Sequence, residues 1–121
     1  MDIQGIDHVA LRVRDLEGAV RFYHRVLGCP VERRQDAVGV VQMRAERALI
    51  DLVSVDGSLG QRGGAAPGLD GHNMDHLCLA LADFDPDAVK GELERHGVAV
   101  GEGVSLYFAD PEGNRIELRA A

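Results

Sequence analysis

The chain has 121 residues, a formal net charge of −7 and a pI of about 5.1, and apolar residues make up 45% of it. This composition is typical of one globular domain with a hydrophobic core, and it argues against intrinsic disorder. The acidic balance argues against a nucleic-acid partner, because phosphate binding needs a basic surface. No apolar run approaches the roughly 20 residues of a membrane span, no signal peptide is visible, and the two cysteines do not make a disulfide framework. We therefore expect a cytoplasmic protein without a membrane partner.

The first part of the chain, residues 1–56, predicts a βαβββ module. Residues 6–13 alternate as a strand does, and Asp15 is then a natural N-cap for a helix over residues 16–27. Gly28 can end that helix because glycine adopts positive φ without strain. Three further strands are expected around residues 31–35, 38–44 and 47–55.

Residues 57–73 contain six glycines and one proline, which is typical of a linker or a mobile loop. An alternative is a lid over a site, with His72 or Asn73 reaching inward.

The remaining residues, 74–121, predict a second and more compressed βαβββ module. A strand over 74–82 is followed by the N-cap Asp85, by Pro86 at the first helical position and by a helix that Gly97 closes. Three more strands are expected at residues 98–100, 104–109 and 115–120, with a turn over 110–114 before the last of them.

The two modules repeat at specific positions. Each opens with an Asp-His pair, at His8 and at His76, and the two histidines are 68 residues apart. Each also closes with a carboxylate inside a strand, Asp51 in the first module and Glu117 in the second. A histidine inside an apolar strand is more often a satisfied core residue, but here the histidine is repeated with its carboxylate.

Side chains alternate between the two faces of a strand, and this alternation places all four residues on the face away from the bulky aliphatic residues. In each strand the histidine or carboxylate lies opposite the bulky aliphatic residues, which would pack on the helices. The other face carries small residues, Arg12 and the four polar side chains, which are His8, Asp51, His76 and Glu117. Two imidazoles and two carboxylates suit one divalent ion, namely Mn, Fe, Co, Ni or Zn. The alternative is two structural histidine–carboxylate hydrogen bonds.

The chain resembles the vicinal oxygen chelate superfamily, which is the glyoxalase, bleomycin-resistance and extradiol-dioxygenase group. The resemblance rests on three stretches: IDHVALRVRDLEGAVRFYHRVLG, MDHLCLAL and YFADPEGNRIEL. It implies an α+β fold in which paired βαβββ modules form a U-shaped mixed sheet around a central cup. It also implies one metal site at the positions of His8, Asp51, His76 and Glu117, and a homodimer whose modules pair within a chain or across two chains.

Two branches of the family are similar at further positions. Bacterial glyoxalase I resembles the chain at HVALRV, which implies that Arg12 holds an anionic group of the substrate, but Asp51 and Val55 stand where glutamate and asparagine are usual. The fosfomycin-resistance enzymes resemble it at SLYFADPEGNRIE, which implies that Ser105 and Tyr107 bind substrate. The alternatives are a salt bridge for Arg12 and core packing for Tyr107.

The resemblance and the ligand set together predict a divalent-metal-dependent lyase or isomerase. The ion would bind two neighbouring oxygens of a small substrate and stabilise an enediolate, while Glu117 or Asp51 moves the proton. The alternatives are a drug-binding protein of the bleomycin-resistance type without catalysis, an antibiotic-modifying transferase and an extradiol dioxygenase. We interpret Cys78 as a small buried filler.

Overall fold

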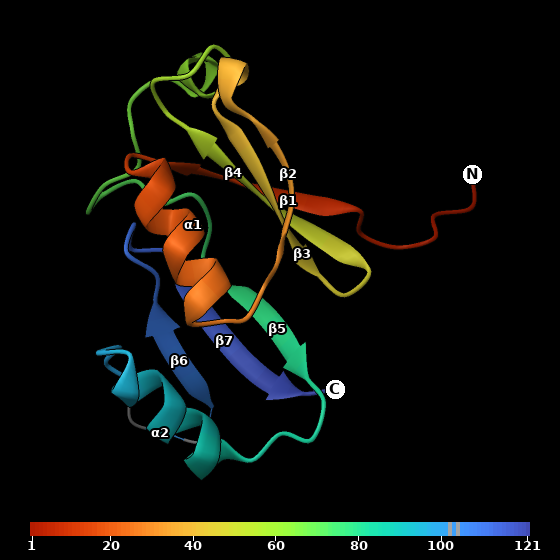
Figure 1. Cartoon of the computed structure of the whole chain (residues 1–121), viewed down its shortest axis with the longest axis vertical. Coiled ribbons are helices and arrows are strands. Elements are labelled where there is room, and N and C mark those ends of the chain that lie inside the picture. Colours follow the sequence, from red (N-terminus) through yellow and green to blue (C-terminus); the bar gives the residue numbers. More distant parts are fainter. Residues whose placement is uncertain (102, 104) are drawn as a thin grey trace. The chain divides into compact units, whose positions relative to one another are not determined.

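The computed structural model describes residues 1–101, 103 and 105–121, which form two compact units, Met1–Pro67 and Gly68–Ala121 (Figure 1). Each unit contains one mixed sheet, of four strands in the first unit and three in the second. The predicted α+β class is confirmed.

Unit 1 has the element order of the predicted βαβββ module. Its helices and strands are β1 (His8–Val13), α1 (Leu16–Arg25), β2 (Val31–Gln35), the 3₁₀ helix η1 (Asp36–Val38), β3 (Val40–Ala45), β4 (Ala48–Ser54) and the 3₁₀ helix η2 (Gly60–Gly63). The strand order is β1-β4-β3-β2, with β1 parallel to β4 and the other neighbours antiparallel.

Local chemistry fixes the ends of α1. The Asp15 side chain accepts a hydrogen bond from the backbone N–H of Gly18 at 3.0 Å, as expected of an N-cap. A Cβ at Gly18 would lie 2.4 Å from the Asp15 carboxylate, so a larger residue there would require the Asp15 side chain to turn. After the helix, Gly28 has a φ of 73°, which agrees with its predicted role at the C-terminal end.

The apolar faces of α1 and of the sheet make the core of unit 1. The helix contacts β3 and β4, and Tyr23, Leu11 and Leu52 are at most 2% exposed. Leu11 and Val13 are buried while His8, at the start of the same strand, is exposed, so the predicted alternation along β1 is confirmed.

Unit 2 contains β5 (Leu77–Leu81), α2 (Pro86–Arg95), β6 (Leu106–Ala109) and β7 (Arg115–Ala120). Asp85 caps α2 as predicted, accepting hydrogen bonds from the backbone N–H groups of Asp87 and Ala88. The strand order is β5-β7-β6, with β5 parallel and β6 antiparallel to β7. This arrangement repeats β1, β4 and β3 of unit 1.

The predicted strand at residues 98–100 is wrong. The backbone N–H of Val98 is used to close the C-terminus of α2, where it bonds the carbonyl of Leu93 at 3.0 Å. The backbone N–H of Gly101 then bonds the carbonyl of Tyr107 at 2.9 Å, and residues 98–100 do not form a strand. The strand predicted from 104 begins at Leu106, and Val104 lies outside the described residues.

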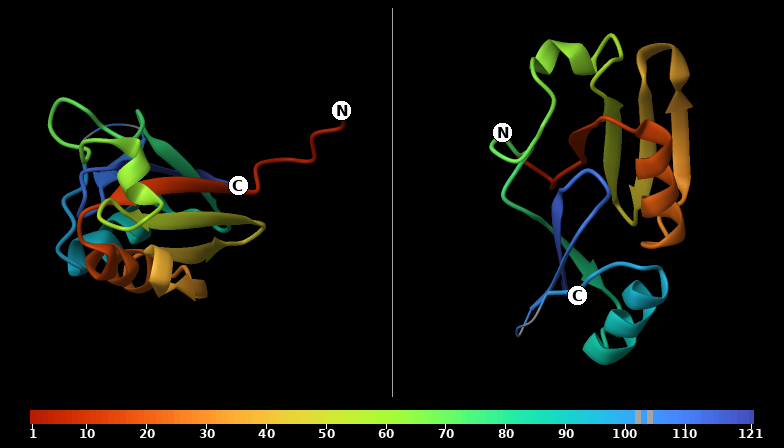
Figure 2. Two further views of the ribbon diagram at one scale, coloured as in Figure 1. Left: turned by 90° about the horizontal axis from the view of Figure 1, so that it is seen from above. Right: turned by 90° about the vertical axis from the view of Figure 1, so that its left-hand side faces the viewer.

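Residues 1–7, before β1, are exposed and extend away from the sheet of unit 1 (Figure 2). In the described ranges, no helix is both long and apolar enough to cross a membrane.

Candidate metal-binding pairs in the two units

The first candidate pair consists of His8 and Asp51, which lie on adjacent parallel strands. The Nε2 atom of His8 is 3.8 Å from Oδ2 of Asp51, and the Asp51 side chain is buried. On the other side of the ring, Nδ1 of His8 is 2.7 Å from Oδ2 of Asp7. Gln42, opposite Asp51 on β3, donates from Nε2 to both carboxylate oxygens, at 3.2 and 3.3 Å. Asp51 therefore faces His8 while its strand neighbour holds it in place.

The charges around His8 have a direct effect on its protonation. The hydrogen bond to Asp7, and then the negative charge of Asp51, raise the pKa of His8 above its ordinary value of 6.5. A positive charge at His8 is stabilised because a carboxylate lies on each side of its ring.

The second pair, His76 and Glu117, repeats this geometry. The Nε2 atom of His76 is 3.4 Å from Oε2 of Glu117, whose residue is 8% exposed, and Nδ1 of His76 is 2.5 Å from Oδ2 of Asp75. The hydrogen bond from His76 lowers the pKa of Asp75. His76 precedes β5 rather than lying inside it, so its predicted place within a strand is wrong by one residue.

The Glu117 carboxylate has two further neighbours, from the strands on either side of it. Tyr107, opposite Glu117 on β6, donates its hydroxyl to the carboxylate, and burial followed by this contact raises the pKa of Tyr107. Cys78, opposite Glu117 on β5, also contacts it, and burial followed by the charge of Glu117 raises the pKa of the thiol. Cys78 is nevertheless exposed as a residue, so its interpretation as a buried filler is wrong.

The strand register explains why the two pairs match. In each unit the carboxylate lies on a strand that is paired on both sides, and its parallel partner residue is two positions after the histidine: Ala10 opposite Asp51, and Cys78 opposite Glu117. Residues two apart in an extended strand share a face, so the histidine lies diagonally across from the carboxylate. Sequence reasoning found both pairs but missed Gln42, whose only signal was its antiparallel register with Asp51.

The donor atoms of each pair suit a divalent cation. A carboxylate can only accept, so each Nδ1 carries the proton that it shares with Asp7 or Asp75. When the ring is neutral, its bare Nε2 lone pair faces a carboxylate oxygen. Two ligand atoms about 2.1 Å from one metal ion lie roughly 3.0–3.4 Å apart for octahedral or tetrahedral angles. The separations of 3.8 and 3.4 Å are close to this range.

The structure brings the four predicted ligands together as two pairs, one in each unit. Among the described residues, neither unit contains a group of three or more His, Cys, Asp or Glu side chains that could hold an ion by itself. A four-residue site that combines both pairs stays a prediction.

Arg12 is engaged by the backbone of its own unit. Its guanidinium donates to the carbonyl oxygens of Gly60, Gly63, Gly64 and Ala65, at distances from 2.7 to 3.2 Å. These contacts give Arg12 a structural role, tying β1 to the segment over residues 60–65. Its predicted contact with a substrate anion stays a prediction.

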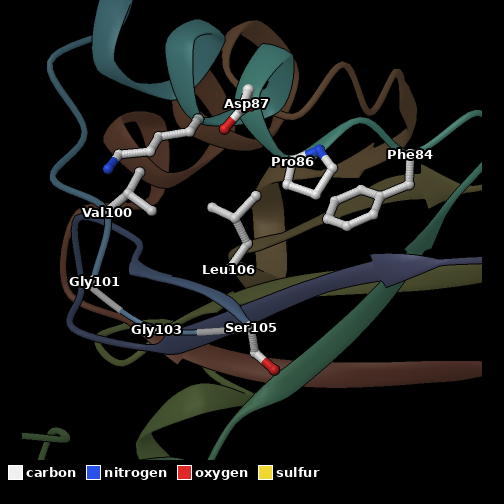
Figure 3. Close-up of a pocket in the computed structure, with 9 residues that line it drawn as sticks. Phe84, Pro86, Asp87, Val100, Gly101, Gly103, Ser105 and Leu106 are labelled. Atoms are coloured by element: carbon white, nitrogen blue, oxygen red, sulfur yellow. The ribbon is translucent and has the colours of Figure 1, made fainter.

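Ser105 lies at the edge of a pocket of about 170 Å³ between the start of α2 and the start of β6. Leu106 points toward Phe84 and Pro86, whereas the Ser105 hydroxyl points the other way (Figure 3). The described lining of this pocket includes neither His76 nor Glu117. The pocket therefore does not join Ser105 to the second pair, and the predicted role of Ser105 in substrate binding is untested.

Known proteins share both the sequence pattern and the fold. The family model described as Glyoxalase/Bleomycin resistance protein/Dioxygenase superfamily matches residues 5–118. Glutathione transferase FosA of Serratia marcescens is 29% identical over 121 residues, which cover 96% of this chain and 80% of that protein. Catechol-2,3-dioxygenase of Bacillus subtilis (strain 168) is 28% identical over 121 residues, which cover 95% of this chain but only 41% of that enzyme.

The solved structures include lactoylglutathione lyase from Agrobacterium tumefaciens, with a TM-score of 0.71 and 20% identity over 98% of this chain and 94% of that one. At this identity the likeness shows a common fold. Together with the family model, which spans nearly the whole sequence, it identifies the chain as a member of the Glyoxalase/Bleomycin resistance protein/Dioxygenase superfamily.

Proposed function

We propose that the protein is a divalent-metal-dependent lyase or isomerase acting on a small molecule with two neighbouring oxygens. One ion, of Ni, Co, Mn, Zn or Fe, would be held by His8, Asp51, His76 and Glu117. The two pairs would meet at this ion either within one chain or across a homodimer.

One observation supports this proposal above the others: in both units a histidine Nε2 faces a carboxylate oxygen while its Nδ1 is bound to an aspartate. Two acceptors that face each other repel unless a cation lies between them. A single case would be satisfied by a proton on the ring. The same arrangement twice, 68 residues apart, supports a shared cation site.

The chain supplies the groups that such a reaction needs. A bound divalent ion supplies Lewis acidity toward the oxygens of the substrate. Asp51 or Glu117 would take the proton from carbon and return it to the neighbouring carbon. Asp51 is fixed by two hydrogen bonds from Gln42, whereas Glu117 has a longer side chain and contacts the Tyr107 hydroxyl. Tyr107 would then hold Glu117 in position.

The first test measures metal binding by the purified, metal-stripped chain. Calorimetry with Mn²⁺, Zn²⁺ and Ni²⁺ is expected to give one ion per chain. His76→Ala is expected to weaken binding by about a hundredfold or more. His96→Ala removes a histidine that contacts Glu92 at the end of α2 and is the matched control. Wild-type protein that takes up none of the three ions would overturn the metal-dependent reading.

A second test separates the two ways of combining the pairs. One variant lacks the first pair (His8→Ala with Asp51→Asn) and another lacks the second (His76→Ala with Glu117→Gln). If the site forms across two chains, refolding the two variants together restores one site in some dimers. If the site forms within a chain, the mixture binds no better than either variant alone.

A glutathione-dependent transferase is the second candidate, because FosA matches 96% of this chain at 29% identity. A panel of 2-oxoaldehyde–thiol adducts, acyl-CoA epimers, fosfomycin with glutathione, and catechols distinguishes the candidates, with each assay run with metal and with chelator. Metal-dependent turnover of an adduct or epimer is expected. If fosfomycin with glutathione is the only pair in the panel that is turned over, the transferase is favoured. Metal binding with no turnover of any substrate would favour a binding protein.

A further inference from the structure

Each candidate histidine follows an aspartate that binds its other ring nitrogen. Nδ1 of His8 is 2.7 Å from Asp7, and Nδ1 of His76 is 2.5 Å from Asp75. Both aspartate side chains lie at the surface, where they are 87% and 84% exposed. An exposed aspartate usually contacts only water. Here each aspartate instead contacts the histidine that follows it, and the contact is the same in both units.

The contact decides which ring nitrogen carries the proton. An ionised carboxylate has no proton to donate, so the hydrogen between Asp7 and His8 belongs to Nδ1. The neutral ring then has its lone pair on Nε2, the atom that faces Asp51. The opposite tautomer would put a proton where an ion has to bind.

We propose that Asp7 and Asp75 are positioning residues that hold His8 and His76 as the Nδ1–H tautomer, with Nε2 turned toward Asp51 and Glu117. This inference rests on the proposed function in one respect, namely that Nε2 is the metal-binding atom. The tautomer itself is a property of the metal-free chain. It can therefore be measured whether or not the protein is a metalloenzyme.

A purely structural role for these aspartates is the competing explanation. Asp75 also interacts electrostatically with Arg115, and Asp7 with Arg44. In the competing explanation, each aspartate only balances the positive charge of its arginine at the surface. Surface charge balance would not fix a ring tautomer. The tautomer is thus the readout that separates the two roles.

The experiment is nitrogen-15 NMR of the histidine rings in metal-free protein at about pH 9, where imidazole is neutral. Wild-type His8 and His76 are expected as the Nδ1–H form. Asp7→Ala and Asp75→Ala are each expected to shift only their own histidine toward the Nε2–H form, and Asp75→Glu to restore the Nδ1–H form for His76. Unchanged tautomers in both alanine variants would overturn the proposal.

Metal affinity gives the second readout, by calorimetry with Mn²⁺. Each alanine variant is expected to bind about tenfold more weakly, at the lower end of the effect of losing a hydrogen bond to a ligand histidine, because these aspartates are exposed. Asp2→Ala and Asp70→Ala remove the same charge from exposed positions and are expected to change affinity less than about twofold. An equal loss in these controls would assign the effect to charge and overturn the positioning role. Wild-type protein that binds no Mn²⁺, Zn²⁺ or Ni²⁺ would instead count against the proposed function, and the tautomer would still decide this inference.

Discussion

Replacing Asn114 by alanine is expected to destabilise unit 2 and loosen the second histidine–carboxylate pair. Asn114 is 4% exposed and lies in the turn between β6 and β7. Its Nδ2 donates to Oδ2 of Asp110 at 2.8 Å, and its Oδ1 accepts from Nδ2 of Asn73 at 2.9 Å. Alanine removes both bonds.

The expected loss follows from the two bonds. A hydrogen bond to a charged group contributes about 1.5–3 kcal/mol, and a neutral one about 0.5–1.5 kcal/mol. In the variant, Oδ1 of Asp110 still accepts hydrogen bonds from the backbone N–H groups of Glu112 and residue 114. The carboxylate therefore keeps hydrogen-bond partners. We therefore expect the free energy of unfolding to fall by about 2–4 kcal/mol.

The same bonds affect the site. Asn73 lies three residues before His76, and Asn114 three residues before Glu117. Their contact ties together the chain just ahead of the parallel strands β5 and β7. Losing it is expected to lower Mn²⁺ affinity, because His76 and Glu117 are then less well aligned.

Urea unfolding followed by circular dichroism measures the effect, in a double-mutant cycle with Asn73→Ala. Because Asn114→Ala and Asn73→Ala break the same bond, the double variant is expected to lose less stability than the sum of the two single losses. Gln61→Ala, which removes an exposed amide, serves as the control and is expected to stay within about 0.5 kcal/mol of wild type. A loss below about 0.5 kcal/mol for Asn114→Ala, or full additivity with Asn73→Ala, would refute the reasoning.

Three further predictions follow from other contacts. Arg12→Ala removes the donors to the carbonyls of residues 60–65 and is expected to lower the free energy of unfolding by about 1–3 kcal/mol, as measured by urea unfolding; full stability in this variant would contradict it. The raised pKa of His8 means that its protonated form stabilises the metal-free protein, fully below the unfolded pKa of about 6.5 and less as pH rises through the folded value. His8→Ala is therefore expected to flatten the fall in stability across that window, and an unchanged pH profile would count against it. Tyr107→Phe removes a donor to Glu117 and is expected to weaken Mn²⁺ binding about two- to tenfold by calorimetry; equal affinity would leave Tyr107 without a positioning role.

Local signals were sufficient for most elements. Asp15 and Asp85 cap the two helices, and the last strand spans residues 115–120 as predicted, because caps and alternation depend on neighbours in sequence. The strand predicted at 98–100 failed for a reason that alternation cannot reveal. Its first N–H closes the preceding helix, so too little backbone is left for a ladder.

The candidate site was predictable in part. The internal repeat pointed to His8 with Asp51 and to His76 with Glu117, and the structure brings each of these pairs together, whereas their joint role as metal ligands stays a prediction. The contacts of Arg12 were not predictable, because its partners are backbone carbonyls about 50 residues away that any sequence would supply.

The sequence by itself determined the α+β class, the two helices and the residue types of the candidate ligands, because periodicity, caps and repetition are written in local order. Only the tertiary structure decided which nitrogen of each histidine faces its carboxylate, and that Gln42 and Tyr107 hold those carboxylates from the neighbouring strands. The physical reason is that strand register and ring orientation come from contacts between distant parts of the chain, and hydrogen bonds of this kind leave no pattern in the order of the residues.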